Sequence, residues 1–92
     1  MHSKMQDMLK NMQKAQQKIQ EIIVTGQSGG GLVKIDIDGQ HQACKVVIDD
    51  SIMDDKGMLE DLVLAAINDA TTKLEDEVKK SMLGFAGDFK LP

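Results

Sequence analysis

Arginine, tryptophan and tyrosine are absent from this 92-residue sequence, and phenylalanine occurs only at Phe85 and Phe89. Aromatic side chains supply the largest buried apolar areas in most cores. Here leucine, isoleucine, valine and methionine must form the core instead. A chain of this size buries only about 60–65% of its unfolded surface. Because 41% of the residues are hydrophobic, we expect some apolar surface to face a second chain.

Cysteine is limited to Cys44, so no disulfide can form within the chain. This fits a reducing cytosol. His41 and Cys44 are three positions apart on an expected strand, which places them on opposite faces and prevents them from sharing a metal ion. We therefore expect no metal and no cofactor, and we expect Cys44 to be a small core residue.

Long apolar runs are also missing. No stretch of 18 apolar residues exists to cross a membrane, and the first ten residues lack the apolar core of a signal peptide. We expect a cytoplasmic protein with no membrane partner.

Two different periods of hydrophobicity define the expected elements. A 3.6-residue period from Ser3 to Ile23 predicts a helix. Strict alternation over Val33–Ile37 predicts a strand, followed by a tight hairpin turn at Asp38-Gly39 and a strand over Gln42–Ile48. A short β-branched segment, Ile22–Thr25, is expected to open the sheet.

A second helix is expected from about Lys56 to Leu83, with Gly84 ending it. Its second half, through Ile67, Leu74 and Val78, has the narrow stripe of a helix–helix contact. Residues 83–92 are expected to form a loose tail. The sequence thus predicts one α+β domain over residues 1–92, in the order α-β-β-β-α, with a three-stranded antiparallel sheet and two long helices.

Three consecutive glycines, Gly29 to Gly31, raise the question of a phosphate-binding loop. Gly26 and Gly31 have the spacing of that motif, but Leu32 and Val33 follow where a lysine and a hydroxyl residue are required. A strand follows them rather than a helix. The glycines are therefore expected to provide positive φ angles and a bend between two strands.

Lysine is unevenly distributed. The net charge is −4, yet residues 1–21 contain four lysines and two acids. Lys10, Lys14 and Lys18 recur every four residues and cover about 80° of the helix, opposite the apolar side. On the residues alone, a solubilising face paired with Asp7 and Glu21 is favoured. A dimer that aligned two such faces would instead offer a backbone contact for a nucleic acid.

Any bound nucleic acid should be duplex and weakly sequence-specific. Guanine readout favours arginine, which is absent, and base stacking needs aromatic residues. Paired acids such as Asp49 and Asp50 fall in an expected capping loop or on a helix surface, without a nucleophile or a base. We therefore expect neither an enzyme nor a small-molecule substrate.

The apolar side of the first helix lacks a partner within so small a domain. We expect two copies to bury it against each other in a homodimer. The interface residues we predict are Met5, Met8, Leu9, Met12, Ile19 and Ile23. A protein–protein interaction module remains the alternative function, with an acidic helix face at Glu60, Asp61 and Asp76 and a methionine-rich surface.

The blocks VTGQSGGGLVKIDIDGQ, VVIDDSI and MLEDLVLAAINDA resemble the YbaB/EbfC family of bacterial nucleoid-associated proteins. The resemblance covers about residues 5–83. It implies a tweezer-like homodimer in the cytoplasm, at the nucleoid, that binds double-stranded DNA and influences gene expression or protects DNA. Family members often carry arginine near the hairpin and in the second helix. This sequence has HQACK before VVID, which implies weaker DNA binding.

Overall fold

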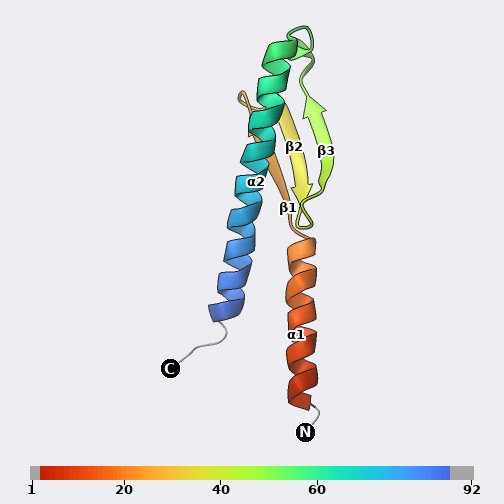
Figure 1. Cartoon of the computed structure of the whole chain (residues 1–92), viewed down its shortest axis with the longest axis vertical. Coiled ribbons are helices and arrows are strands. Elements are labelled where there is room, and N and C mark those ends of the chain that lie inside the picture. The colour runs from red at the N-terminus through yellow and green to blue at the C-terminus, as the bar shows by residue number, and fades with distance from the viewer. Residues whose placement is uncertain (1–2, 88–92) are drawn as a thin grey trace.

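The computed structural model describes residues 3–87, with side-chain burial described from Lys4 to Leu83. Its elements are α1 (Ser3–Gln20), β1 (Ile23–Ser28), β2 (Val33–Asp38), β3 (Ala43–Ile48), the short 3-10 helix η1 (Asp50–Ile52) and α2 (Lys56–Gly87). Figure 1 shows α1 leading into the sheet and α2 returning along it. The predicted α-β-β-β-α order is confirmed.

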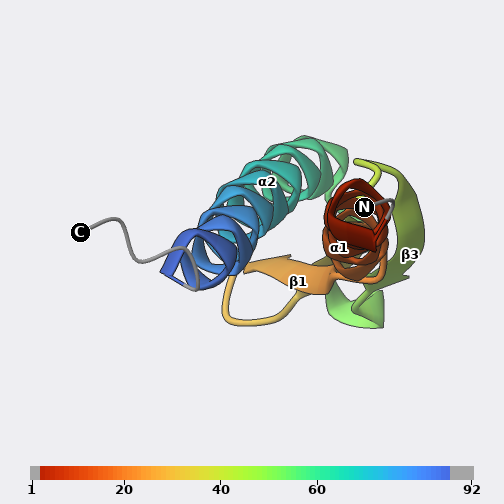
Figure 2. The ribbon, with the colours of Figure 1, turned by 90° about the horizontal axis from the view of Figure 1, so that it is seen from below.

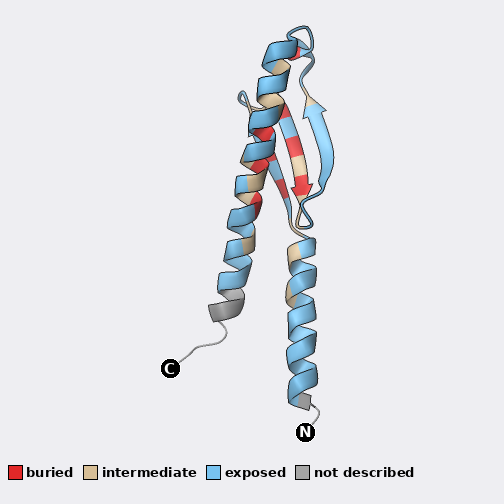
Figure 3. Cartoon of the chain, in the orientation of Figure 1, coloured by how far each residue is buried: buried red, intermediate tan, exposed pale blue. Residues whose placement is uncertain are grey.

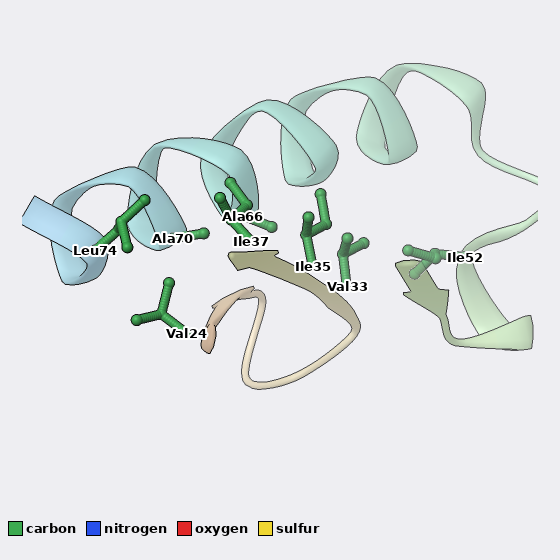
Figure 4. Close-up of a cluster of buried hydrophobic side chains, with 8 residues drawn as sticks. All are labelled: Val24, Val33, Ile35, Ile37, Ile52, Ala66, Ala70 and Leu74. Carbon is green, nitrogen blue, oxygen red and sulfur yellow. The ribbon is translucent and has the colours of Figure 1, made fainter. Parts of the chain in front are cut away.

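The three strands form one antiparallel sheet in the order β1-β2-β3. Val33, Ile35 and Ile37 of the central strand are buried, and the residues between them are not. This alternation turns one face of β2 toward α2. From the helix, Ala66, Ala70 and Leu74 meet that face at four-residue spacing and are fully buried. Val24 and Ile52 complete this core (Figure 4).

A close approach between α2 and β1 makes the core compact. Gly26 lies against the backbone of Ala66 and Ala70, and a Cβ at Gly26 would overlap those atoms. Glycine is therefore required at position 26, because the space between β1 and α2 is too small for a Cβ atom. The helix can lie directly on the strand because neither Gly26 nor the two alanines carries a large side chain.

The molecule is long and thin, with principal extents of 66 × 25 × 14 Å. The 32 residues of α2 span about 48 Å, whereas the six-residue strands span about 20 Å. The C-terminal half of α2 therefore extends past the sheet, on the same side as α1 (Figure 1). Most of both projecting helices is exposed (Figure 3).

The triple glycine forms the bend that the sequence predicts. Gly29, Gly30 and Gly31 have φ angles of 61°, 70° and 98°, in the left-handed region that favours glycine. The N–H of Gly31 donates to the carbonyl of Ser28 (3.1 Å), which closes the turn. A strand follows the loop, so the helix N-terminus that a phosphate loop needs is missing from this place.

The hairpin between β2 and β3 is longer than the tight turn predicted at Asp38-Gly39. The N–H of His41 donates to the carbonyl of Asp38 (3.0 Å). His41 itself has a φ of 64°. The Asp38 Oδ1 atom accepts from the N–H groups of Gln40 (2.9 Å) and Gln42 (3.0 Å). This is a longer connection of the type in which a turn is followed by a left-handed residue.

Cys44 is exposed, so the prediction of a core cysteine is wrong. The register shifts between Asp36 and Ile37 opposite this part of β3, and β3 lies at the sheet edge. The Figure 2 view places α2 away from this strand. The residues of β3 are therefore not buried on either face. Among the residues that the structure describes, no group of three potential metal ligands occurs.

Two element boundaries also differ from the predictions. Helix α1 ends at Gln20, so Ile23 begins β1 instead of ending a helical stripe. Helix α2 continues through Gly84 to Gly87, because a glycine costs a helix only about 1 kcal/mol. The prediction of a loose tail from residue 83 is therefore wrong as far as Gly87. Residues 88–92 lie outside the described residues.

Candidate nucleic-acid interface

Helix α1 contacts α2 and, through its last turn, the β2–β3 hairpin. The carbonyl of Ile19 lies so close to Gly39 of the β2–β3 hairpin that a Cβ there would overlap it. Ile22, just after the helix, packs against the core. Ala15 and Ile19 are half-buried, whereas the stretch from Lys4 to Lys14 is exposed. Helix α1 is therefore an arm with most of its surface available for contacts.

The three lysines predicted as a binding site are all exposed on this arm. Ion pairs within the described part of the chain are Lys56–Glu60 (3.8 Å), Lys73–Asp69 (2.8 Å) and Lys80–Glu77 (3.7 Å), all on α2. The expected pairs of Lys10 with Asp7 and of Lys18 with Glu21 are not among them. The ammonium groups of Lys10, Lys14 and Lys18 thus remain available to phosphates.

The opposite side of α1 is apolar and open to solvent. Met5 is 74% exposed, Met8 60% and Met12 53%, and Leu9 is 57% exposed. Ile19 belongs to the same side but is half-buried. Ile23, which we placed in this group, lies on β1 and is 64% exposed there. It alternates with the buried Val24, so its side chain is on the sheet face away from α2.

Acidic residues gather at the far end of the molecule from α1. Asp49 and Asp55 act there as caps: the Asp49 Oδ1 atom accepts from the N–H of Ser51 (2.9 Å), and Asp55 Oδ1 accepts from that of Met58 (3.1 Å). The hydrogen bond from Ser51 lowers the pKa of Asp49. The acids of this loop therefore stabilise helix starts, as predicted.

One polar contact was not found from the sequence. On α2, the Asp69 Oδ2 atom accepts from the N–H of Gln27 (2.9 Å) and pairs with Lys73 (2.8 Å). The Lys73 Nζ atom donates to the carbonyl of Thr25 (3.1 Å). Together, Asp69 and Lys73 bind the outer edge of β1. The i,i+4 spacing of Asp69 and Lys73 in the sequence indicates their ion pair. It does not indicate their contact with β1, which depends on the tertiary fold.

This contact predicts a pH effect. The hydrogen bond from Lys73, and then that from Gln27, lowers the pKa of Asp69 below 3.8. The stabilisation is therefore complete above that value and is lost as the pH falls through the folded-state pKa. As the pH falls from about 5 to about 2, the free energy of unfolding should decrease less for Asp69→Asn than for the wild type. Urea unfolding across this range measures it, and equal slopes for both proteins would contradict the contact.

The fold and the lysine-bearing arm define a small α+β protein with an exposed cationic helix. The YbaB/EbfC DNA-binding family matches residues 1–89, and the chain belongs to this family. The fold is similar to the crystal structure of the uncharacterized protein HP0035 from Helicobacter pylori. The TM-score is 0.74 at 27% identity, over 89% of this chain and 88% of that one. No helix within residues 3–87 is long and apolar enough to span a membrane.

Proposed function

We propose that the protein is a homodimer that binds double-stranded DNA through its α1 lysines, with weak sequence preference and no catalytic step. It acts in the bacterial cytoplasm at the nucleoid, where coating the DNA influences gene expression or protects the duplex. The main support is an exposed lysine row, free of ion pairs within the described residues, in a member of a DNA-binding family.

The radius of gyration and the accessible surface of the single chain support a homodimer. Its radius of gyration is 18.3 Å, whereas a compact chain of this length should have about 12 Å. Its accessible surface is 7249 Å², roughly 2,000 Å² more than a compact monomer of this mass exposes. An excess of that size is what each partner of an obligate dimer buries. The exposed methionine side of α1 is an apolar part of this surface.

The side-chain chemistry supports backbone contacts over base contacts. Lysine attracts phosphate as a point charge, while arginine forms the bidentate contacts that read guanine. The sequence has no arginine, and it has no aromatic residue before Phe85. Binding should therefore depend on the charge and width of the duplex more than on its sequence.

The salt dependence of binding tests this function. Three lysines from each copy would neutralise about six phosphates, so affinity should fall on the order of a thousandfold between about 50 and 200 mM salt. Fluorescence anisotropy with three unrelated duplexes of equal length should give the same slope and similar affinities. A flat salt response, or no binding at the lowest salt, would refute the proposal. Strong preference for one duplex would refute its sequence tolerance.

A further inference from the structure

The two edges of the sheet differ in how their backbone groups are satisfied. At the β1 edge, the Asp69 carboxylate accepts from the N–H of Gln27, and the Lys73 ammonium group donates to the carbonyl of Thr25. The opposite edge is β3, on the side away from α2 (Figure 1). Residues 43–47 of this strand are all exposed (Figure 3). An edge strand with free backbone groups is a template for another strand, so the sheet can be extended at β3.

The hydrogen bonds to β2 determine which backbone groups of β3 face outward. At the end of the β2–β3 ladder, the N–H of Asp49 donates to the carbonyl of Leu32 (2.8 Å). Hydrogen-bonded pairs occur at every second position of an antiparallel ladder, and the register is regular over residues 45–48. Positions 45, 47 and 49 therefore direct their backbone groups toward β2. The N–H and C=O groups of Val46 and Ile48 face away from the sheet.

The residues of β3 make this edge complementary to itself. A two-fold axis at Val47 places Val47 of one copy opposite Val47 of another, in an antiparallel pair of β3 strands. Val46 is then opposite Ile48, and their outward-facing groups form the hydrogen-bonded pairs, with about four N–H···O bonds in all. Lys45 is opposite Asp49 at both ends of the pair. Opposite charges at directly opposed positions stabilise paired strands, so backbone and charge favour the same register.

The neighbouring registers lack this match of charges. An axis at Val46 would place Lys45 opposite Val47, and an axis at Lys45 would set two lysines against each other, which is unfavourable. Lys45 has no ion pair among the residues that the structure describes. The Asp49 Oδ1 atom accepts from the N–H of Ser51, which leaves Oδ2 for an ammonium group. Both charges are therefore available for the pair.

We propose that homodimers associate edge to edge, through antiparallel pairing of β3 with β3 of a copy in the next homodimer. The pairing joins two three-stranded sheets into one continuous sheet, with α2 of both copies on the same face. The two α2 helices do not collide, because α2 leaves β3 uncovered. Each homodimer has two β3 edges, so repeated pairing produces a row of homodimers.

This pairing rests on the proposed function and specifies how the coating of DNA extends. A single pair of short strands is marginal in water. Homodimers bound side by side on one duplex have a high effective concentration for each other, so the pairing is strongest there. Homodimers should therefore fill a long duplex cooperatively, whereas a duplex that holds one homodimer should show simple binding.

Disulfide cross-linking without DNA tests the pairing directly. Across the proposed axis, the two Val47 residues form a non-hydrogen-bonded pair with Cα atoms about 4.5 Å apart, which suits a disulfide. In a Cys44→Ser background, Val47→Cys should give covalently linked rows of homodimers upon mild oxidation. Ala43→Cys is the matched control: Ala43 is also exposed on β3, but the two copies would be about 26 Å apart along the strands. Equal cross-linking of both variants, or none at position 47, would overturn the proposal.

Reversal of the edge charge gives an independent test. Lys45→Glu would set two acids against each other at both ends of the strand pair, and should lower the association constant between homodimers at least about tenfold. Lys34→Glu is the matched control, because Lys34 is exposed and pairs with Val47 on the same sheet face, one strand further in. Sedimentation velocity measures association, and anisotropy with a long duplex measures cooperativity. Equal association and equal cooperativity in the two variants would overturn the proposal.

These tests separate the β3 pairing from the proposed function. Homodimers that bind duplex DNA with the expected salt slope, but do not cross-link at position 47, keep the function and overturn the pairing. Rows that cross-link at position 47 but do not bind duplex DNA at low salt do the reverse. A product linked at position 47 whose native mass remains that of two chains would overturn the proposal, because β3 would then pair within the homodimer.

Discussion

Replacing Lys10, Lys14 and Lys18 together by glutamine should weaken duplex binding at least about a thousandfold near 150 mM salt. About six phosphate contacts per dimer disappear, so the plot of log affinity against log salt should flatten from a slope of about −5 to nearly zero. Glutamine has a helix propensity close to that of lysine, and the three side chains are exposed. Helix α1 and the dimer should therefore remain intact.

Three lysines of α2 provide the matched control. Lys56, Lys79 and Lys80 are also exposed, and their replacement by glutamine changes the net charge by the same amount. Their ion pairs with Glu60 and Glu77 are at the surface and contribute little to stability. The control should keep the salt slope of the wild type. Equal losses of binding in both triple variants would mean that net charge, and not the α1 arm, determines DNA binding.

The order of elements followed from the sequence because hydrophobic period is a local property. The alternation of Val33, Ile35 and Ile37 identified the central strand, and its buried face lies under α2 as that pattern requires. The strand expected over Gln42–Ile48 also formed, but Cys44 is exposed on it. Alternation shows which residues share a face, but whether that face is covered depends on how wide the helix is relative to the sheet. One helix about 10 Å across does not cover three strands.

Boundaries were less predictable than elements. Ile23 satisfies both the helical period of α1 and the β-branched pattern of β1, and the structure places it in the strand. The position of the lysine row was predictable from spacing alone. Its lack of ion pairs with residues 3–87 was not, since side-chain rotamers decide it. The contact of Asp69 and Lys73 with β1 required a tertiary register that no local pattern contains.

Gly26→Ala should destabilise the fold by about 3 kcal/mol or more, a large part of the roughly 5–14 kcal/mol expected for 92 residues. The new methyl group would overlap the backbone of Ala66 and Ala70. Because backbone cannot move aside as a side chain can, the sheet and α2 would have to separate. Separation loosens the contact of β1 with Leu74 as well. Urea unfolding at a fixed protein concentration measures the loss, since dimer stability depends on concentration.

The same change at other glycines distinguishes this overlap from a general effect of alanine. A methyl group on Gly57, at the start of α2, would meet only Asp55 Oδ1, at 3.9 Å, and Gly57→Ala should stabilise the helix by up to about 1 kcal/mol. Gly30 has open space but a φ of 70°, so Gly30→Ala should cost about 1–2 kcal/mol from backbone strain alone. The order Gly26, Gly30, Gly57, from most to least destabilising, follows from contact and conformation. A Gly26→Ala protein as stable as the wild type would show that α2 does not lie directly on β1.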